Sequence, residues 1–290
     1  TAEAYKMSAK IAAIKRPFAG YESNKEPMLK VIEKHNAAAD KLAGYISDHP
    51  NQEKSYRSPL LVSLASESTK TWQEAVTLGR EFGYKNAQVT LLAPTGTIAF
   101  LMDCDTTGIE PELALVKYKK LVGGGTLKLV NNQVGPALKR LGYDEKQIAA
   151  ILKYVFKEGT IEGAPNLKPE HLPVFDCSFK PQKGIRSISY AGHIKMMGAV
   201  QPFLSSAISK TVNLPNTATV DDIKNTFIQA WNLGLKAVAI YRDGCKSVQP
   251  LNVSETKIDI NLVEKIDGYT RIKLPDDRDS KTHKFSIAGH

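Results

Sequence analysis

The chain has 290 residues, of which 42% are hydrophobic and 24% are charged, and this composition excludes a collagen-like, coiled-coil or largely disordered protein. Lysine and arginine number 39 against 30 aspartates and glutamates. The net charge of +9 suits an anionic partner such as a nucleotide or a phosphate, although a mixed, solvated surface has the same composition. No basic stripe is interleaved with aromatic residues, which argues against nucleic acid as a partner.

No run of about 18 apolar residues is present to span a membrane, and the N-terminus lacks the pattern of a secretory signal. Cys104, Cys177 and Cys245 lie far apart without metal-ligand spacing, as is usual in a reducing compartment. We therefore expect a cytoplasmic protein with no membrane partner and no metal site. Because the chain opens on Thr1 and ends within a strand-like stretch, 284–287, we expect it to be a piece of a longer protein.

The N-terminal part of the chain is predicted to be helical. Its periodicity indicates a helix over about 3–13, a turn over 16–20, and a long helix over about 26–46. The apolar stripe of the long helix is Met28, Leu29, Ile32, Ala39 and Leu42. His35 lies beside this stripe, and we interpret it as a packed or solvated side chain rather than a ligand.

A helix and a strand are predicted next. Ser68 or Thr69 can cap a helix that ends at Gly83. Its inward face carries Trp72, Ala75, Val76 and Phe82. Residues 87–92 form an apolar run typical of a buried strand, so helix, loop and strand make an α/β unit.

The middle of the chain is predicted to contain three further helical pieces. Asp144 is expected to cap a helix that Gly159 ends, followed by a loop over 165–173. The inward face of this helix is Ile148, Ile151, Leu152 and Val155. Residues 190–201 form a second helix, with Ile194, Met197 and Val200 inward, and about 203–211 form a third helical piece.

The last predicted elements are a helix and a strand. Thr219 caps the helix, Asp221 and Asp222 favour its N-terminus, and Gly234 ends it. Its inward residues are Ile223, Phe227, Ala230 and Trp231. Residues 236–241 read as a buried strand, and the alternation of helices with short apolar strands favours a parallel sheet, closed or doubly wound.

The sharpest local motif follows the predicted strand 87–92. It consists of Pro94, Thr95, Gly96, Thr97 and Ile98. A small turn between strand and helix can direct free backbone N–H groups, hydroxyls and the positive end of a helix toward a phosphate. Gly96 would let a backbone approach without a Cβ, but no lysine follows, so this is not the phosphate loop of ATPases. An ordinary strand-to-helix turn is the alternative.

Four other motifs could carry chemistry, each with a structural alternative. The loop 104–111 could line an active site or simply hold capping side chains, and Gly123–Gly125 form a turn without a dinucleotide fingerprint. His193 reads as a core-adjacent histidine more readily than as a general base. Arg242 and Asp243 end the last strand, where α/β barrels carry function, or form a structural ion pair.

Taken together, these segments resemble the large catalytic chain of adenosylcobalamin-dependent (class II) ribonucleotide reductase. The resemblance rests first on Pro94-Thr95-Gly96-Thr97-Ile98 and on the stretches 86–89, 103–111 and 114–125. It continues through 187–190, 196–197, 201–203, 207–213 and 241–244, and so covers nearly the whole chain.

The resemblance implies a ten-stranded α/β barrel that reduces ribonucleotides to deoxyribonucleotides by thiyl-radical chemistry. Adenosylcobalamin would generate the radical, and a thioredoxin-type protein would return the electrons. The turn from Pro94 to Ile98 would bind the substrate phosphates. Allosteric nucleotides and a homodimer are compatible with the resemblance, which does not distinguish a diphosphate from a triphosphate substrate.

The departures from the family pattern define the expected extent of this chain. The family's radical cysteine lies in a finger-loop motif that has no match here, and its tail cysteine pair would lie beyond His290. Cys104, Cys177 and Cys245 match neither role and are expected to be packed or exposed thiols, so no catalytic residue is assigned. We expect residues 1–244 to be the second half of the barrel and 245–290 an irregular connector into a truncated small domain.

Two rival functions remain open at the level of sequence. One is a different phosphate-binding α/β enzyme, for which the turn would be the only evidence. The other is a non-catalytic nucleotide-binding half-barrel remnant. In either case the isolated chain is expected to be inactive as a reductase.

Overall fold

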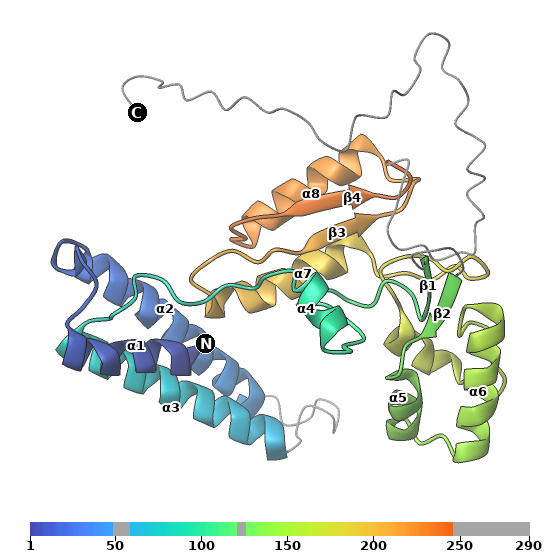
Figure 1. Cartoon of the computed structure of the whole chain (residues 1–290), viewed down its shortest axis with the longest axis horizontal. Coiled ribbons are helices and arrows are strands. Elements are labelled where there is room, and N and C mark those ends of the chain that lie inside the picture. Colours follow the sequence, from blue (N-terminus) through green and yellow to red (C-terminus); the bar gives the residue numbers. More distant parts are fainter. Residues whose placement is uncertain (49–58, 121–125, 246–290) are drawn as a thin grey trace, which may run out of the picture. The chain divides into compact units, whose positions relative to one another are not determined.

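The computed structural model describes residues 1–48, 59–120 and 126–245 (Figure 1). In chain order the elements are α1 (Ala2–Lys15), α2 (Tyr21–Asp48), α3 (Pro59–Phe82), α4 (Gly96–Leu101), β1 (Val116–Lys120), β2 (Thr126–Val130), α5 (Val134–Arg140), α6 (Glu145–Glu158), the 3-10 helix η2 (Pro169–Phe175), α7 (Tyr190–Val200), the 3-10 helix η3 (Gln201–Phe203), β3 (Thr211–Leu214), α8 (Val220–Asn232) and β4 (Ala239–Arg242). The triglycine turn 123–125 and the connector after Cys245 lie outside the described residues.

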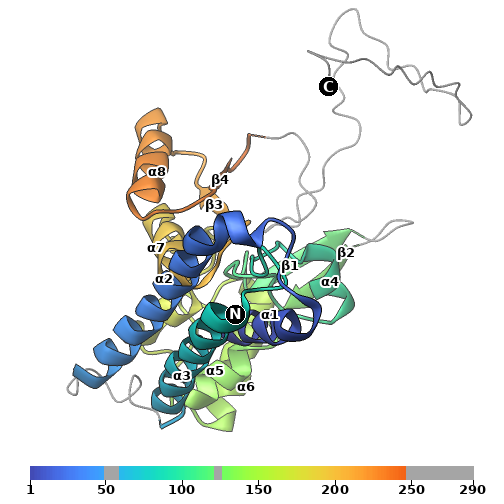
Figure 2. The ribbon, with the colours of Figure 1, turned by 90° about the vertical axis from the view of Figure 1, so that its left-hand side faces the viewer.

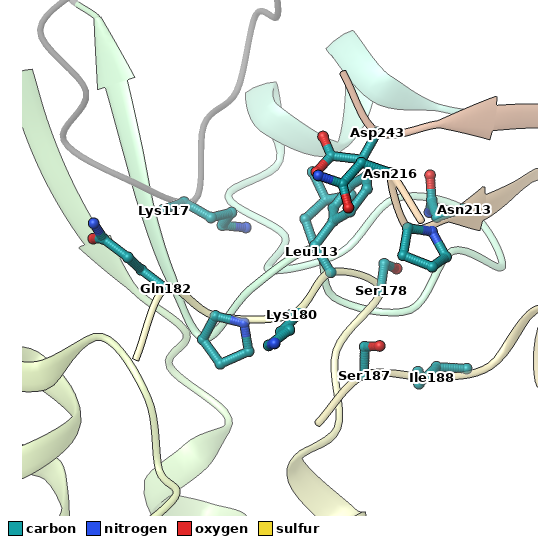
Figure 3. A pocket seen from close by; sticks show the side chains of 13 residues that line it. Leu113, Lys117, Ser178, Lys180, Gln182, Ser187, Ile188, Asn213, Asn216 and Asp243 are labelled. Atoms are coloured by element: carbon teal, nitrogen blue, oxygen red, sulfur yellow. The ribbon is translucent and has the colours of Figure 1, made fainter. Parts of the chain in front are cut away.

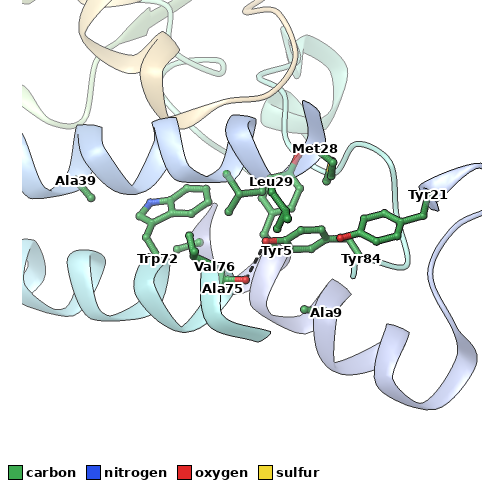
Figure 4. Close-up of a cluster of buried hydrophobic side chains, with 12 residues drawn as sticks. Tyr5, Ala9, Tyr21, Met28, Leu29, Ala39, Trp72, Ala75, Val76 and Tyr84 are labelled. Carbon is green, nitrogen blue, oxygen red and sulfur yellow. Dashed lines mark hydrogen bonds between the residues drawn. The ribbon is translucent and has the colours of Figure 1, made fainter. Parts of the chain in front are cut away.

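The first three helices pack on one another around an aromatic core. Helix α3 contacts both α1 and α2, and α2 and α3 run side by side in both views (Figures 1 and 2). Tyr5, Trp72 and Tyr84 are fully buried between them, and the Tyr84 hydroxyl donates to the carbonyl of Ala75 at 2.9 Å (Figure 4). Burial of such large rings is a major source of hydrophobic stabilisation.

The predicted faces of these helices are largely confirmed. Met28, Leu29, Ile32 and Ala39 are buried, whereas Leu42 is 43% exposed, so the apolar stripe of α2 stops one turn early. His35 is buried, accepts or donates at Ser205 Oγ (2.9 Å) and contacts the carbonyl of Pro202, which confirms that it is packed.

The predicted start of α3 is wrong. The helix begins at Pro59, so Ser68 and Thr69 lie in its interior and cap nothing. Proline is favoured in the first turn, where its missing N–H would have no helical partner. The predicted end is confirmed, because Gly83 has φ +70° and donates to the carbonyl of Gly79 at 2.9 Å.

Both predicted strands are shorter in the structure, where 236–241 becomes β4 (Ala239–Arg242), and the strands β1, β2 and β3 were not predicted. Strand β3 pairs in parallel with β4, and β1 pairs antiparallel with β2, giving two two-stranded sheets in the described residues. Of the predicted strand 87–92, only Leu92 forms a ladder position, a parallel bridge to Ile208. The half barrel of the sequence prediction is therefore not seen as a continuous sheet.

The predicted helical piece over 203–211 is also wrong. Helicity ends with η3 at Phe203, and the chain then runs extended into β3. Pro202 removes one helical N–H donor. The extended chain gains hydrogen bonds to the segment before the 94–98 turn instead, for example from Ser206 N–H to the Thr90 carbonyl at 2.9 Å.

A second core gathers around α5 and α6. Leu138, Ile151 and Val155 are fully buried there. The predicted cap of α6 is confirmed, since Asp144 and Gln147 form a reciprocal capping box and Gly159 ends the helix with φ +75°. The predicted loop 165–173 is partly wrong, because η2 begins within it at Pro169.

Helix α7 packs against both β3 and α8, beside the parallel pair of β3 and β4. The capping box of Thr219 and Asp222 starts α8 as predicted. The predicted inward face of α8 is partly wrong: Ala230 is buried as predicted, but Phe227 and Trp231 are 50% and 80% exposed and Thr226 is buried instead. The row of Thr226 and Ala230 lies about 100° around the helix from the row of Phe227 and Trp231, and the buried side of α8 is centred on the first row.

Two glycines in the helical core give a matched test of the packing. A Cβ on Gly79 would overlap the ring and hydroxyl of Tyr84, whereas a Cβ on Gly44 in α2 would meet nothing within 4 Å. We predict that Gly79→Ala lowers the free energy of unfolding by about 1–3 kcal/mol through overpacking. Gly44→Ala should raise it by about 0.5–1 kcal/mol through helix propensity. Urea unfolding measures both; an equal response of the two variants would contradict the packing.

Candidate functional site

The turn from Pro94 to Ile98 leads directly into helix α4. Thr95 has φ +53°, a left-handed conformation that costs a β-branched residue on the order of 1–3 kcal/mol. The Ala99 N–H donates to the Thr95 carbonyl at 2.8 Å and closes the first helical turn. Within the described residues, the N–H groups of Gly96, Thr97 and Ile98 have no recorded acceptor, as expected for the first positions of a helix.

The space above this turn is open. A Cβ built on Gly96 would meet nothing within 4 Å, and Gly96 does not have a positive φ, so the conformation itself does not require glycine there. Thr97 and Ile98 are exposed, and Thr95 is half-buried. A shallow hollow beside the turn is lined by Thr95, Ile98, Ala99, Thr106 and Gln133, among others. An incoming group can therefore reach the three backbone donors.

The loop 104–111 packs against the chain that leads into the turn. Gly108 has φ +52°, and a Cβ there would lie 2.8 Å from the carbonyl oxygen of Ala93. Only glycine permits this close approach. Asp105 accepts from the Asn132 N–H at 3.1 Å and from Gln133 Nε2 at 3.2 Å, so its carboxylate holds the start of α5. The loop therefore makes structural contacts through Asp105, and it also borders the hollow beside the turn through Thr106 and Gly108.

A buried polar cluster lies between this loop, α7 and the start of β3. Lys210 Nζ lies 3.0 Å from Glu110 Oε2, 2.6 Å from His193 Nδ1 and 2.7 Å from the Thr211 carbonyl. The other carboxylate oxygen of Glu110 accepts from the Thr211 N–H at 2.7 Å. The sequence did not predict this cluster, because its members are up to about a hundred residues apart and share no periodic pattern.

His193 is buried, as predicted, and faces Lys210. Burial first, and the Lys210 charge second, lower the pKa of His193 from 6.5 to about 4. Its Nδ1 accepts from the ammonium group, so the neutral ring carries its proton on Nε2, for which the described residues offer no partner. The imidazole is therefore a neutral acceptor and not a base available to solvent.

The pKa of His193 makes stability depend on pH in a defined direction. In the unfolded chain the imidazole of His193 is protonated as pH falls below about 6.5, whereas in the folded chain it stays neutral down to about pH 4. The unfolded chain therefore gains protons over this range, and the free energy of unfolding falls. The full loss corresponds to about 3 kcal/mol at roughly 1.4 kcal/mol per pKa unit. We predict that His193→Gln, which keeps a carbonyl acceptor for Lys210, loses less stability than the unchanged protein between pH 7 and pH 4.5 in urea unfolding. Equal losses would contradict the assignment.

A cavity of about 340 Å³ lies where β3 and β4 end (Figure 3). Its polar lining includes Lys117, Ser178, Lys180, Asn213, Asn216 and Asp243. Parallel strands of α/β proteins carry functional groups at their C-terminal ends. Arg242 holds the rim of the cavity, since its guanidinium donates to the carbonyls of Asn216 and Ala218. This cavity was not predicted beyond the mention of Arg242 and Asp243.

The cysteines fit the predicted reading as packed or exposed thiols. Cys177 is buried, and burial raises the pKa of its thiol to about 12, so it stays protonated. Cys104 and Cys245 are exposed. Among the residues that the structure describes, no three His, Cys, Asp or Glu side chains converge as a metal site, and no helix is both long and apolar enough to cross a membrane.

Comparison with known proteins shows the family to which this chain belongs. The sequence model of the family described as "Ribonucleotide reductase, barrel domain" matches residues 1–241. The chain therefore belongs to the ribonucleotide reductase barrel-domain family, whose fold is an α/β barrel.

Curated relatives are similar over the whole chain. A vitamin B12-dependent ribonucleotide reductase of Rhodopirellula baltica is 50% identical over 99% of this chain and 27% of its own length. Proteins of the same name from Streptantibioticus cattleyicolor and Streptomyces avermitilis are 45% and 44% identical over 100% of this chain. The chain covers 47% and 30% of those two proteins, so it spans less than half of each of these relatives.

Proposed function

We propose that this chain is part of a vitamin B12-dependent ribonucleotide reductase that converts ribonucleoside diphosphates or triphosphates to deoxyribonucleotides. The observation that carries the proposal is the family match over residues 1–241, together with relatives of that name at 44–50% identity over nearly the whole chain. An adenosylcobalamin cofactor, a thioredoxin-type reductant, allosteric nucleotides and a homodimer belong to the same proposal. The free cysteines suit the reducing cytoplasm in which such a reaction would run.

We also infer that residues 1–244 form the second half of a ten-stranded barrel and that 245–290 form a connector. The parallel pairing of β3 with β4 and the parallel bridge from Leu92 to Ile208 support this inference. The family match ends at residue 241, close to the proposed boundary.

The role of the turn in this enzyme is to hold the substrate phosphates. Three backbone N–H groups, the hydroxyls of Thr95 and Thr97, and the open space over Gly96 provide donors without a lysine. Such contacts contribute positioning of the reacting ribose rather than electrons or protons.

The cavity at the ends of β3 and β4 does not fit a corrin. Its volume of about 340 Å³ is at the lower end of the range for drug-sized ligands, and a corrin with its nucleotide tail is larger than such ligands. No step of the cofactor chemistry is therefore assigned to these residues. Cys177 is buried and protonated, so it does not suit the redox pair either.

The alternative function is a non-catalytic nucleotide-binding remnant. Both functions would use the phosphate turn. They differ in whether the complete protein turns over a ribonucleotide. Deoxyribonucleotide formation by a complete protein containing this sequence would support the reductase, and nucleotide binding without turnover would support the remnant.

The phosphate turn is tested in the complete protein by comparing a nucleotide with its nucleoside. Removing the hydroxyl of Thr95 or Thr97 by substitution with Ala should weaken nucleotide binding by about tenfold to a hundredfold, since a charge-assisted hydrogen bond contributes about 1.5–3 kcal/mol. Gly96→Val should do more damage, because a branched side chain would fill the open space and block all three N–H groups at once.

Thr77→Ala is the matched control for the threonine variants. Its hydroxyl lies on α3, where it donates to the carbonyl of Gln73 at 2.9 Å, away from the turn in sequence and in its contacts. Titration by calorimetry gives both affinities for each variant. Equal weakening of nucleotide and nucleoside by the turn variants would show that the turn is only structural.

A further inference from the structure

The chain before the phosphate turn, at Leu92, and the chain after it, at Glu110 beyond α4, are both attached to one short segment, residues 206–211. On the entering side, the Leu92 N–H donates to the Ala207 carbonyl at 3.4 Å, and the Ser209 N–H donates to the Leu92 carbonyl at 2.9 Å. These backbone hydrogen bonds hold Leu92, and with it the chain that leads into the turn, against residues 207–209.

On the leaving side, the attachment is made by the side chain of Glu110. Its two carboxylate oxygens accept separately, one from Lys210 Nζ at 3.0 Å and one from the Thr211 N–H at 2.7 Å. Between the turn and Glu110, Gly108 packs directly on the carbonyl of Ala93. A displacement of Glu110 would therefore reach the turn through Ile109 and Gly108 and through the contact of Gly108 with Ala93.

The attachment is strong because Lys210 has no route to water. Its side chain is 1% exposed, and that of Glu110 is 19% exposed. The three N–H bonds of the ammonium group are all used, by Glu110, His193 and the Thr211 carbonyl. Loss of the carboxylate would leave a buried charge without its counter-ion, which is far more costly than the loss of an exposed pair.

We propose that Glu110 is a positioning residue for substrate phosphate. Its carboxylate binds the chain after the turn to residues 210 and 211, and the same segment of chain also binds Leu92 before the turn. Glu110 does so without touching the substrate. This inference rests on the proposed phosphate-binding role of the turn. It adds that the backbone donors of Gly96, Thr97 and Ile98 keep their alignment only while Glu110 stays bonded to Lys210 and Thr211.

The test uses the complete protein with Glu110→Gln and Glu110→Asp. Gln keeps an acceptor for the Thr211 N–H and removes the charge that Lys210 needs. Asp keeps the charge on a side chain shorter by one methylene, so it should draw the loop toward β3. Each change should reduce the ratio of nucleotide to nucleoside affinity by about tenfold or more, because a misplacement of about 1 Å can have effects up to a hundredfold.

Asp176→Asn is the matched control. Asp176 is also 19% exposed and binds Arg186 through two hydrogen bonds of 2.7 Å, but it has no recorded contact with the turn or with residues 206–211. It should lower stability without changing the ratio of affinities, and a merely structural Glu110 would behave in the same way.

The outcomes separate this inference from the phosphate assignment. If Gly96→Val leaves the ratio unchanged, the phosphate role of the turn is wrong. If Gly96→Val lowers the ratio while folded Glu110→Gln and Glu110→Asp proteins keep it, the positioning role is overturned. If the Gln variant does not fold, as judged by circular dichroism, the Asp variant decides: a lowered ratio supports the proposal, and an unchanged ratio overturns it.

Discussion

The ammonium group of Lys210 is buried, and a buried charge is tolerated only where every one of its hydrogen bonds is made. Here the three acceptors come from three parts of the chain: the loop after the phosphate turn, helix α7 and the start of β3. Satisfying one charge therefore fixes these parts against one another. This arrangement also bears on the backbone donors of the turn, because Leu92, just before the turn, is hydrogen-bonded to Ala207 and Ser209, which precede Lys210.

The features that could be predicted from the sequence are local. The capping boxes of α6 and α8 lie within four residues, and Gly83 and Gly159 end their helices by adopting a positive φ that other residues avoid. The phosphate-binding role of the turn 94–98 stays a prediction, made because small and hydroxyl residues are concentrated at a predicted strand-to-helix junction. The family resemblance added the likeness to a ribonucleotide reductase, which the comparisons confirm.

The features that could not be predicted depend on contacts across long stretches of chain. Glu110 and Lys210 are a hundred residues apart, and nothing in either neighbourhood marks them as partners. Part of the predicted face of α8 is wrong for a related reason: Phe227 and Trp231 are the larger apolar pair, but the buried side chains are those of Thr226 and Ala230, of which only Ala230 was predicted. The periodicity of apolar residues shows that a helix has an apolar face. It does not show which of two adjacent faces packs against the rest of the protein.

A crystal structure of the complete protein with a bound ribonucleotide tests the central claim most directly. We predict phosphate oxygens within about 3 Å of the N–H groups of Gly96, Thr97 and Ile98, as in ordinary hydrogen bonds, with the pair of Glu110 and Lys210 intact. Phosphate bound instead in the cavity of Lys117 and Lys180, at the ends of β3 and β4 and with the turn empty, would contradict it.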